Sequence, residues 1–319
     1  MEGTVRAVCL SKARGTEKTN VGRAELRPDW GLVGDAHAGH WHRQVSLLSA
    51  DKIAAFNARG ADVQPGAFGE NLVVEGLDFR ALPVGTLLRC GTVLLEMTQI
   101  GKECHTHCAI YHRMGECIMP HEGVFAKVVE GGAIAVGDTM TVEARPAPLP
   151  FQAAVITLSD RCAAGAREDK SGPTIVARLQ AEGYDVLETL LLPDDRPALE
   201  KELRRLCDQR RPDLILTTGG TGFSPRDVTP EATLAVAERQ APGIAEAIRA
   251  ASLRITPRAM LGRGVSVIRG KTLIVNLPGS PKACTESMDV FLGQMPHALT
   301  LLRGAVTDCA APQQKENTP

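Results

Sequence analysis

Residues 213–231 read Asp-Leu-Ile-Leu-Thr-Thr-Gly-Gly-Thr-Gly-Phe-Ser-Pro-Arg-Asp-Val-Thr-Pro-Glu, and this stretch decides the fold of its half of the chain. The apolar run 214–216 is typical of a buried strand in a parallel sheet. The glycines after it let the backbone turn tightly and approach a ligand closely. Thr229-Pro230-Glu231 predicts a helix start, with Thr229 as the N-cap. A strand, a glycine loop and a helix start predict a site for phosphate, and the carboxylate of Asp227 adds a ligand for Mg²⁺.

Outward from this stretch, strands and helices alternate through residues 151–307. Such alternation predicts an α/β domain of three layers, with a doubly wound and mostly parallel sheet. We expect the strands at 153–158, 186–192, around 214–216 and at 272–276. We expect the helices at 172–182, 196–209, after 229, at 244–253 and at 281–302, the last with a break near Pro296.

Residues 1–144 show a different pattern, with short strands and frequent turn signals. Strands are predicted at 4–10, 44–49, 86–90, 92–99 and 139–144, with one helix at 49–59. This half is expected to be a compact β-rich barrel or sandwich. Three prolines between 145 and 150 predict an extended linker, since proline continues neither a helix nor a central strand. The polar residues 308–319 are expected to be disordered.

Composition restricts the possible partners. The chain has 319 residues, a net charge of −1 and no long basic run, which argues against nucleic acid as the partner. Neither a secretory signal nor a membrane-length apolar stretch is recognisable, so we expect a cytoplasmic protein that does not bind membranes. The nine cysteines are then expected to be reduced thiols.

Polar or glycine-rich segments follow four of the predicted strands, and the carboxyl ends of parallel strands share one edge of a sheet. We therefore expect one ligand site there. Its residues are Ser159, Asp160, Ser171, Gly172, Asp194, Thr218, Gly219, Gly220, Thr221, Gly222, Asp227, Asn276, Pro278, Gly279, Ser280 and Lys282. Asp194, Asp195 and Ser171 are equally suited to capping helices, and Pro278-Gly279 to forming a plain turn.

These segments also carry a family resemblance. Ser159-Asp-Arg, Asp169-x-Ser-Gly-Pro, Thr217-Thr-Gly-Gly-Thr-Gly, Arg226-Asp-Val-Thr-Pro-Glu-Ala-Thr and Asn276-Leu-Pro-Gly-Ser-Pro-Lys resemble the motifs of the MogA/MoaB molybdopterin-binding family, from about residue 151 to 303. The resemblance implies transfer of AMP from Mg-ATP to molybdopterin, with pyrophosphate released. It implies that Asp194 and Asp227 are catalytic and hold Mg²⁺, and that the other residues of the edge bind pterin and nucleotide. It also implies a homo-oligomer, with a trimer favoured.

The first half carries a second resemblance. Gly34-Asp-Ala-His-Ala-Gly, Arg43-Gln-Val-Ser-Leu and Pro65-Gly-Ala-Phe-Gly-Glu-Asn-Leu, with Thr98-Gln99, Cys104 and Gly137-Asp138, resemble a MOSC domain. This module is similar to the C-terminus of molybdenum cofactor sulfurases, and the match runs from about residue 3 to 142. The resemblance implies binding of molybdenum cofactor, or sulfur carried on a cysteine. The arginine and proline that usually precede that cysteine are absent here.

Cysteines and histidines are concentrated between 104 and 117. A persulfide on Cys104 is the preferred interpretation. Zinc held by Cys104, Cys108 and Cys117 with a histidine is the alternative, and plain thiols are a third. Structural hydrogen bonds are the preferred role of His37, His40 and His42, with ligation as the alternative. Glu70 and Asn71 suit either a binding loop or a turn.

The leading hypothesis is a molybdenum cofactor protein of two modules, in which the second is a molybdopterin adenylyltransferase and the first holds the cofactor or delivers sulfur. Its substrates are then molybdopterin and ATP, and its partners are other molybdenum cofactor enzymes. Pyridoxal phosphate is not expected. A second hypothesis is non-enzymatic, namely a carrier that stores the pterin cofactor. Release of pyrophosphate from ATP with molybdopterin separates the two hypotheses.

Overall fold

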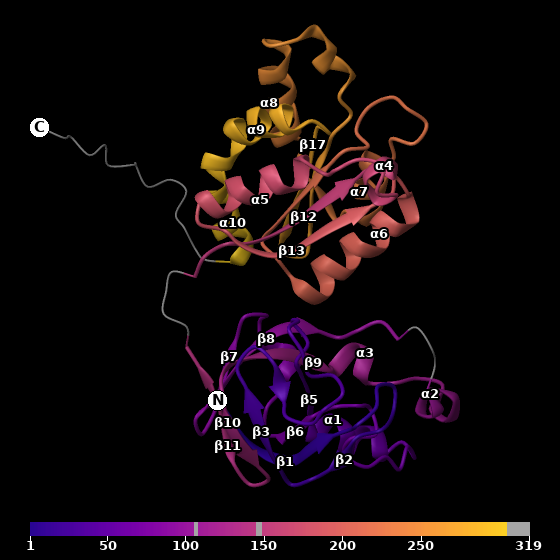
Figure 1. The fold of residues 1–319 in the computed structure, drawn as a ribbon, viewed down its shortest axis with the longest axis vertical. Helices are drawn as coiled ribbons and strands as arrows, with labels where there is room; N and C mark the ends of the chain where they lie inside the picture. The colour runs from indigo at the N-terminus through magenta and orange to yellow at the C-terminus, as the bar shows by residue number, and fades with distance from the viewer. Residues whose placement is uncertain (105–107, 145–148, 305–319) are drawn as a thin grey trace, which may run out of the picture. The chain divides into compact units, whose positions relative to one another are not determined.

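The computed structural model describes residues 1–104, 108–144 and 149–304. The chain divides into two compact units, Met1–Leu149 and Pro150–Pro319 (Figure 1). Part of the predicted linker (145–148) and all of the predicted disordered tail (308–319) lie outside the described residues. None of the described helices is long and apolar enough to cross a bilayer.

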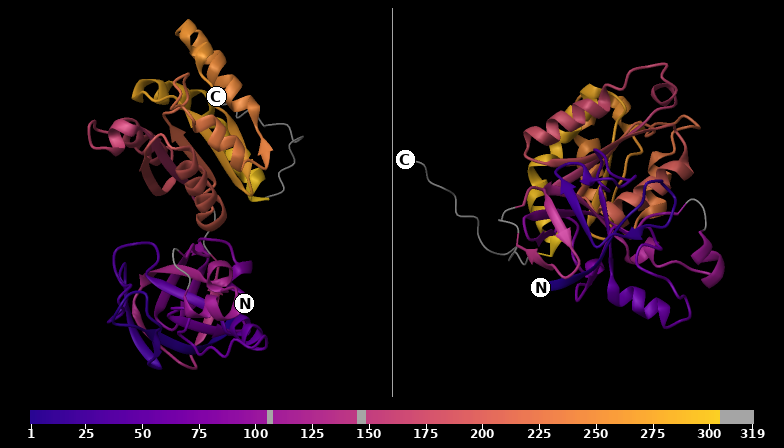
Figure 2. Two further views of the ribbon diagram at one scale, coloured as in Figure 1. Left: turned by 90° about the vertical axis from the view of Figure 1, so that its right-hand side faces the viewer. Right: turned by 60° about the horizontal axis from the view of Figure 1, so that its bottom comes forward.

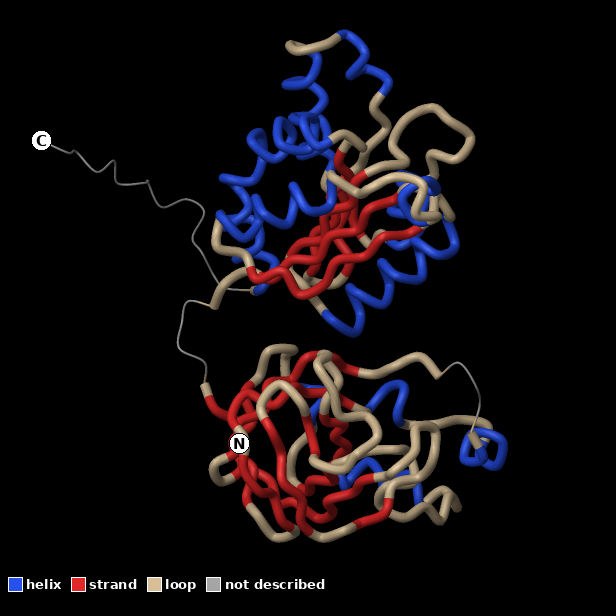
Figure 3. The backbone as a smooth tube through the Cα atoms, in the orientation of Figure 1, coloured by secondary structure: helices blue, strands red, loops and turns tan. Residues whose placement is uncertain are grey.

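Seven strands of the first unit close into a barrel (Figure 3). Around the barrel they are β11 (Thr139–Glu143), β7 (Leu87–Cys90), β8 (Val93–Ile100), β9 (Val124–Glu130), β5 (Val45–Ser49), β6 (Leu72–Glu75) and β1 (Glu2–Leu10). Closure comes from β1 and β11, where Gly3 lies opposite Met140. Neighbouring strands are antiparallel, except that β5 and β6 run parallel. The predicted barrel is confirmed, and the sandwich alternative is excluded.

Shorter elements surround the barrel. They are β2 (Thr19–Asn20), β3 (Arg23–Arg27), β4 (Gly31–Leu32), α1 (Ala50–Asn57), η1 (Phe79–Ala81), α2 (Ala109–Met114), α3 (Met119–Glu122) and β10 (Gly132–Ala135). β10, β3 and β4 form a separate small sheet. The sequence predicted α1 but none of the other elements in this group, because each is only two to six residues long.

Strand β6 shows how the barrel is stabilised. Leu72 and Val74 point into the barrel interior, whereas Val73 points outward and packs in a second cluster with Ile53 and Phe56 of α1. Successive side chains of a strand alternate between its faces. Both faces are covered here, so the strand is apolar at three consecutive positions rather than at every second one.

The second unit is built on one mixed sheet. Its strands lie in the order β13 (Asp185–Leu192), β12 (Gln152–Leu158), β14 (Leu214–Thr218), β17 (Thr272–Leu277), β16 (Ser266–Arg269) and β15 (Arg239–Gln240). The first four are mutually parallel, and β16 and β15 are antiparallel additions. The four parallel strands were predicted, and the two short antiparallel strands were not.

Helices cover both faces of this sheet, as Figures 1 and 2 show. They are α4 (Asp160–Ala163), α5 (Ser171–Ala181), α6 (Arg196–Arg205) with the π turn η2 (Leu206–Arg210), α7 (Thr229–Val236), α8 (Pro242–Leu253), η3 (Pro257–Leu261), α9 (Pro281–Phe291), η4 (Leu292–Gln294) and α10 (Met295–Arg303). Leu214 and Leu216 pack with α5, α8, α9 and α10, and Ile215 packs with α6 and α7. The predicted three-layer fold is confirmed.

The break in the last helix lies one turn earlier than the prediction placed it. The interruption is the 3₁₀ turn Leu292–Gln294, and Pro296 lies in the first turn of α10. Proline is tolerated at that position because the first amides of a helix have no partner within the helix.

Candidate active site

The four predicted loops do meet at one edge of the C-terminal sheet. The Thr218 hydroxyl at the end of β14 donates to the carbonyl of Pro278 after β17, at 2.6 Å. The Ser171 hydroxyl at the start of α5 donates to the carbonyl of Gly279, at 2.9 Å. A Cβ added at Gly219 would lie 2.2 Å from the carbonyl oxygen of Leu158 in β12, so these loops are in backbone contact.

The glycine loop after β14 depends on two glycines with left-handed backbone. Gly219 has φ +94° and Gly220 has φ +61°, a region that other residues adopt only with strain. The loop is closed by Thr229, whose buried hydroxyl donates to the carbonyl of Gly219, at 2.9 Å. The prediction of Thr229 as an N-cap was wrong. Thr229 already lies inside α7, so its side chain is directed back to the loop and caps nothing.

Asp194, which follows β13, is paired with Asp160, which follows β12. The amide of Asp194 donates to Asp160 Oδ1 at 3.0 Å, and the amide of Asp160 donates to Asp194 Oδ2 at 2.9 Å. The remaining oxygen of Asp194 faces the glycine loop, since a Cβ added at Gly220 would lie 3.2 Å from Oδ1. The pair fixes the direction in which Asp194 points.

Asp227 reaches the same loop from its other end. Its Oδ2 accepts the amide of Ser224 at 2.8 Å and lies 2.9 Å from the Cβ position of Gly222. Burial raises the pKa of Asp194, and the negative charges of Asp160 and Asp227 raise it further. Asp194, whose ionisation is opposed by nearby negative charge, faces the same glycine loop as Asp227, and a cation bound there would be stabilising.

The donor set matches Mg²⁺, which prefers oxygen ligands and is bound by one or two carboxylates together with phosphates. Asp194 Oδ1 and Asp227 Oδ1 accept no hydrogen bond from any of the described residues. These two oxygens are therefore available to a metal, while the second oxygen of each carboxylate holds it in position.

Two arginines shape this site, and the sequence did not single out either of them. Arg226 donates to both oxygens of Asp160, at 2.9 and 2.7 Å, and this contact lowers the pKa of Asp160. Arg263, which precedes β16, donates to the carbonyls of Gly222 and Asp227 and pairs with Glu231. Arg263 therefore holds the glycine loop against α7.

Several predicted site residues have structural partners. Ser159 and Ser280 cap α4 and α9 through their hydroxyls, and Asp195 caps α6. Ser171 does not cap its own helix. Asp169 instead accepts the amides of Ser171 and Gly172.

Asn276 and Lys282 also differ from simple ligand residues. The buried Asn276 amide donates to Thr217 and Thr233, both at 2.9 Å, and so ties β17 to β14 and α7. The side chain of Lys282 is 83% exposed and lies 3.8 Å from Glu286. Asn276 therefore ties these elements together and also lines the pocket described next, and Lys282 remains accessible at the rim of the site.

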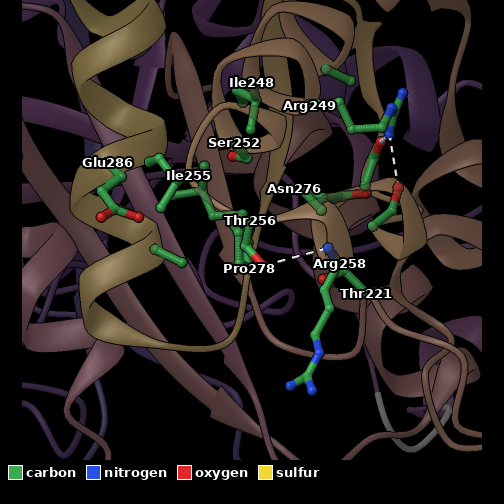
Figure 4. A pocket seen from close by; sticks show the side chains of 16 residues that line it. Thr221, Ile248, Arg249, Ser252, Ile255, Thr256, Arg258, Asn276, Pro278 and Glu286 are labelled. Carbon is green, nitrogen blue, oxygen red and sulfur yellow. Dashed lines mark hydrogen bonds between the residues drawn. The ribbon is translucent and has the colours of Figure 1, made fainter.

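A pocket of about 270 Å³ adjoins the glycine loop (Figure 4). Its apolar walls include Ile248 of α8, Ile255 and Pro278, and Thr221 of the glycine loop lies at its edge. Glu286 of α9 supplies a carboxylate. The segment between α8 and β16, which forms one wall, was not predicted as part of the site.

That wall is held in place by one arginine. Arg249 of α8 donates to the carbonyls of Gly262 and Gly264, at 3.0 and 3.1 Å. Figure 4 shows Arg249 at the border of the pocket. Backbone that is fixed in this way gives the pocket a preformed shape, as is usual for small-molecule sites.

In the N-terminal unit, Cys104 and Cys108 are exposed and Cys117 is half-buried. Burial raises the pKa of Cys117 to about 11, and Cys108 and Cys104 raise it further. Residues 105–107, which include His105 and His107, lie outside the described residues. Within the described part of the chain, no three His, Cys, Asp or Glu side chains are grouped to hold a metal. The zinc interpretation stays a prediction.

The three N-terminal histidines have hydrogen-bonding partners. His40 Nδ1 lies 2.9 Å from Asp29, and His42 Nε2 lies 2.9 Å from Gln99. The amide of His37 donates to Asp35, at 2.9 Å. The contacts of His40 and His42 agree with the structural role preferred from the sequence. The contact of His37 is made by its backbone, and its imidazole Nδ1 lies 3.4 Å from Asp35 Oδ1.

Glu70 and Asn71 are buried inside the barrel unit. Glu70 accepts the amides of Gly66 and Phe68, at 2.7 and 3.0 Å. Asn71 donates to the carbonyl of Cys9 and to Asp35, at 3.0 and 3.2 Å. The turn-stabilising role, one of the two alternatives, matches these contacts.

A doubly wound sheet with a glycine loop and paired carboxylates at its strand ends is typical of α/β proteins that bind phosphorylated ligands. A family model described as "Probable molybdopterin binding domain" matches residues 154–297, and a MOSC domain model matches residues 34–141. The chain belongs to the MogA/MoaB-like molybdopterin-binding family and carries a MOSC domain in its first half.

Curated relatives of the second half are enzymes. The molybdopterin adenylyltransferase of Haemophilus influenzae is 47% identical over 137 residues, covering 42% of this chain and 70% of the relative. That of Escherichia coli is 39% identical over 170 residues, covering 49% and 87%. Among solved structures, the molybdopterin biosynthesis enzyme MoaB of Thermus thermophilus is 46% identical with a TM-score of 0.47, covering 48% of this chain and 97% of its own.

Proposed function

We propose that the C-terminal half transfers AMP from Mg-ATP to molybdopterin, giving adenylyl-molybdopterin and pyrophosphate. The observation that carries the proposal is the pair of carboxylates, Asp194 and Asp227, that face one glycine loop with an oxygen free on each. The similarity to relatives named molybdopterin adenylyltransferase supports the same reaction.

The chemistry requires two anions to approach each other, because the phosphate of molybdopterin attacks the α-phosphate of ATP as pyrophosphate leaves. A bound Mg²⁺, held by Asp194 and Asp227, would neutralise phosphate charge. The chain's own contribution is positioning. Turn amides between Gly219 and Gly222 are hydrogen-bond donors for phosphate oxygens, and their preset geometry requires no reorganisation during the reaction.

We assign the neighbouring pocket to the pterin ring. Its apolar walls suit a flat fused heterocycle, and a small number of polar groups at the border fixes the orientation. The pyrimidinone edge of a pterin carries two adjacent N–H donors, which match the two oxygens of the Glu286 carboxylate. Adenine has a ring acceptor beside its amino group, and a carboxylate suits that edge less well.

Substitution of Asp227 tests the reaction. Asp227→Asn keeps an oxygen that can accept the Ser224 amide but removes the charge. We expect turnover to fall about a hundredfold or more, as for loss of a preorganised electrostatic contact, while molybdopterin binding is largely retained. An adenylylation assay beside a pterin-binding titration measures both.

Asp185→Asn is the matched control, because Asp185 is an exposed carboxylate at the opposite end of β13 from Asp194. Unchanged turnover in Asp227→Asn would remove Asp227 from the mechanism. The carrier hypothesis makes a different prediction for the wild-type protein. It predicts molybdopterin binding without release of pyrophosphate from ATP.

For the N-terminal half we propose a role in binding molybdenum cofactor, with sulfur carried on Cys104. The exposure of the Cys104 thiol supports this role. In the simplest step, the Cys104 thiolate attacks the terminal sulfur of a donor persulfide, and the donor leaves as its thiol. No oxidant is needed, since the sulfane sulfur passes between thiols unchanged in oxidation state.

The test is mass spectrometry of the alkylated protein after exposure to a low-molecular-weight persulfide. We expect the persulfide adduct on Cys104, and its loss in Cys104→Ser but not in Cys90→Ser, whose thiol is buried. An adduct that persists undiminished in Cys104→Ser contradicts the proposal. Delivery to other molybdenum cofactor enzymes, and assembly as a trimer, stay predictions.

A further inference from the structure

Arg226 lies beside the proposed magnesium ligands, and its partner is another side chain of the site. Its Nε and Nη2 both donate to Asp160, and the two side chains are 59% and 43% exposed. The other arginine at this loop, Arg263, comes from the segment before β16 and donates to the carbonyls of Gly222 and Asp227. Arg226 therefore differs from Arg263, because its partner is an accessible carboxylate and not a backbone carbonyl.

Asp160 has a second contact that does not depend on the arginine. Its Oδ1 accepts the amide of Asp194, and its own amide donates to Asp194 Oδ2. The position of Asp160 is thus fixed by two backbone hydrogen bonds. An exposed ion pair adds little stability to such an arrangement, so release of Arg226 from Asp160 has a small free-energy cost.

We propose that Arg226 is a nucleotide-binding residue. Without nucleotide it is paired with Asp160, and when ATP binds it leaves Asp160 and contacts the phosphates. The inference rests on the proposed function and adds a ligand to that site. A guanidinium that binds a carboxylate through two parallel donors has the geometry to bind a phosphate in the same way. A triphosphate carries more charge than Asp160, so the exchange favours the nucleotide.

A purely structural role gives the opposite expectation for one variant. If Arg226 only anchors Asp160, then removal of either partner breaks the same contact, and ATP affinity falls or stays unchanged in both cases. If Asp160 competes with ATP for Arg226, removal of the arginine weakens ATP binding and removal of the carboxylate strengthens it. A gain in affinity in Asp160→Asn that requires Arg226 therefore distinguishes competition from a purely structural role.

The experiment is calorimetric titration of the full-length protein with ATP in a chelating buffer without Mg²⁺. For Arg226→Gln we expect affinity to fall roughly ten- to a hundredfold, the usual effect of losing hydrogen bonds to a charged group. For Asp160→Asn, which keeps an acceptor for the Asp194 amide, we expect a gain of about two- to fivefold, the strength of an exposed ion pair that no longer competes.

The double variant separates release of Arg226 from a general loss of negative charge. In the Arg226→Gln background, we expect Asp160→Asn to add little affinity, because there is no arginine to release. If Asp160→Asn raises ATP affinity equally in the wild-type and Arg226→Gln backgrounds, the inference is overturned. It is also overturned if Arg226→Gln binds ATP with wild-type affinity. Arg226→Lys, which keeps the charge without the paired donors, is expected to bind ATP with intermediate affinity. Molybdopterin binding reports that each variant is folded.

The two proposals fail in different ways. A wild-type protein that binds ATP but releases no pyrophosphate with molybdopterin overturns the adenylyltransferase function and leaves the role of Arg226 standing. A working adenylyltransferase in which Arg226→Gln and Asp160→Asn shift ATP affinity in the same direction overturns the role of Arg226 alone.

Discussion

Gly220 is the residue on which the proposed metal site depends most directly. Its φ is +61°, and an added Cβ would lie 2.5 Å from Thr229 Oγ1 and 3.2 Å from Asp194 Oδ1. A side chain here therefore strains the backbone and disturbs both the loop closure and the carboxylate.

We expect Gly220→Ala to lower adenylyl transfer at least tenfold, and to destabilise the unit by about 1–3 kcal/mol as a result of the strained backbone. Turnover and the denaturant midpoint measure the two effects. Gly243→Ala in α8 is the control, because a Cβ there meets nothing within 4 Å. Full activity in Gly220→Ala would show that Asp194 is not held against the loop.

At the scale of residues, the sequence predicted acidic and glycine positions better than arginine contacts. Asp194 comes shortly after β13, and Asp227 lies in the loop between β14 and α7, so the strand pattern places both at the sheet edge. Arg226 and Arg263 each reach their partners through a long side chain, and Arg263 comes from a segment more than thirty residues later in the chain. Such contacts depend on tertiary packing, which no local pattern records.

Among the elements, the loop after β14 is held by the segment that leads into β16. Arg263 bonds two carbonyls of the loop and the Glu231 side chain, and its amide donates to the carbonyl of Thr221, at 3.0 Å. One side chain thus joins the glycine loop, α7 and the wall of the pocket.

For Arg263→Gln we expect turnover to fall about tenfold or more, since small displacements of positioned groups have large effects on rate. The unfolding midpoint should also fall, because partly buried hydrogen bonds to a charged group are lost. Arg254→Gln, an exposed arginine at the end of α8, is the comparison. Equal kinetics in the two variants would mean that the loop keeps its shape without Arg263.

The sequence predicted the regular elements whose hydrophobic pattern extends over many residues, such as α5, α6 and the parallel strands. The pocket was not predicted, because one of its walls consists of η3 and the turns around it, between α8 and β16. The strands β15 and β16, of two and four residues, were not predicted either. Short antiparallel strands at a sheet edge have too few residues for their alternation to be recognised. Their register depends on the strands already present.

For the whole molecule, the division into two units has a direct consequence for stability. The hydrophobic clusters of residues 1–149 and of residues 150–304 share no member among the described residues. Each unit therefore has a core of its own, which is the usual condition for folding alone.

We expect the fragments 1–149 and 150–319 to fold separately, each with a cooperative thermal transition, and the second to retain adenylyl transfer. Calorimetry of the fragments and of the intact chain compares the transitions, and the pyrophosphate assay measures activity. A second fragment that is folded but inactive would show that the barrel unit takes part in the reaction.

The closure of the barrel by β1 and β11 has a consequence for biosynthesis. The two closing strands are residues 2–10 and 139–143, the first and last strands of that unit. During synthesis, β1 and β7 therefore each lack their β11 neighbour until nearly the whole unit has been translated. Open strand edges recruit other chains, so a translational pause shortly before residue 139 would leave the nascent chain at its most aggregation-prone.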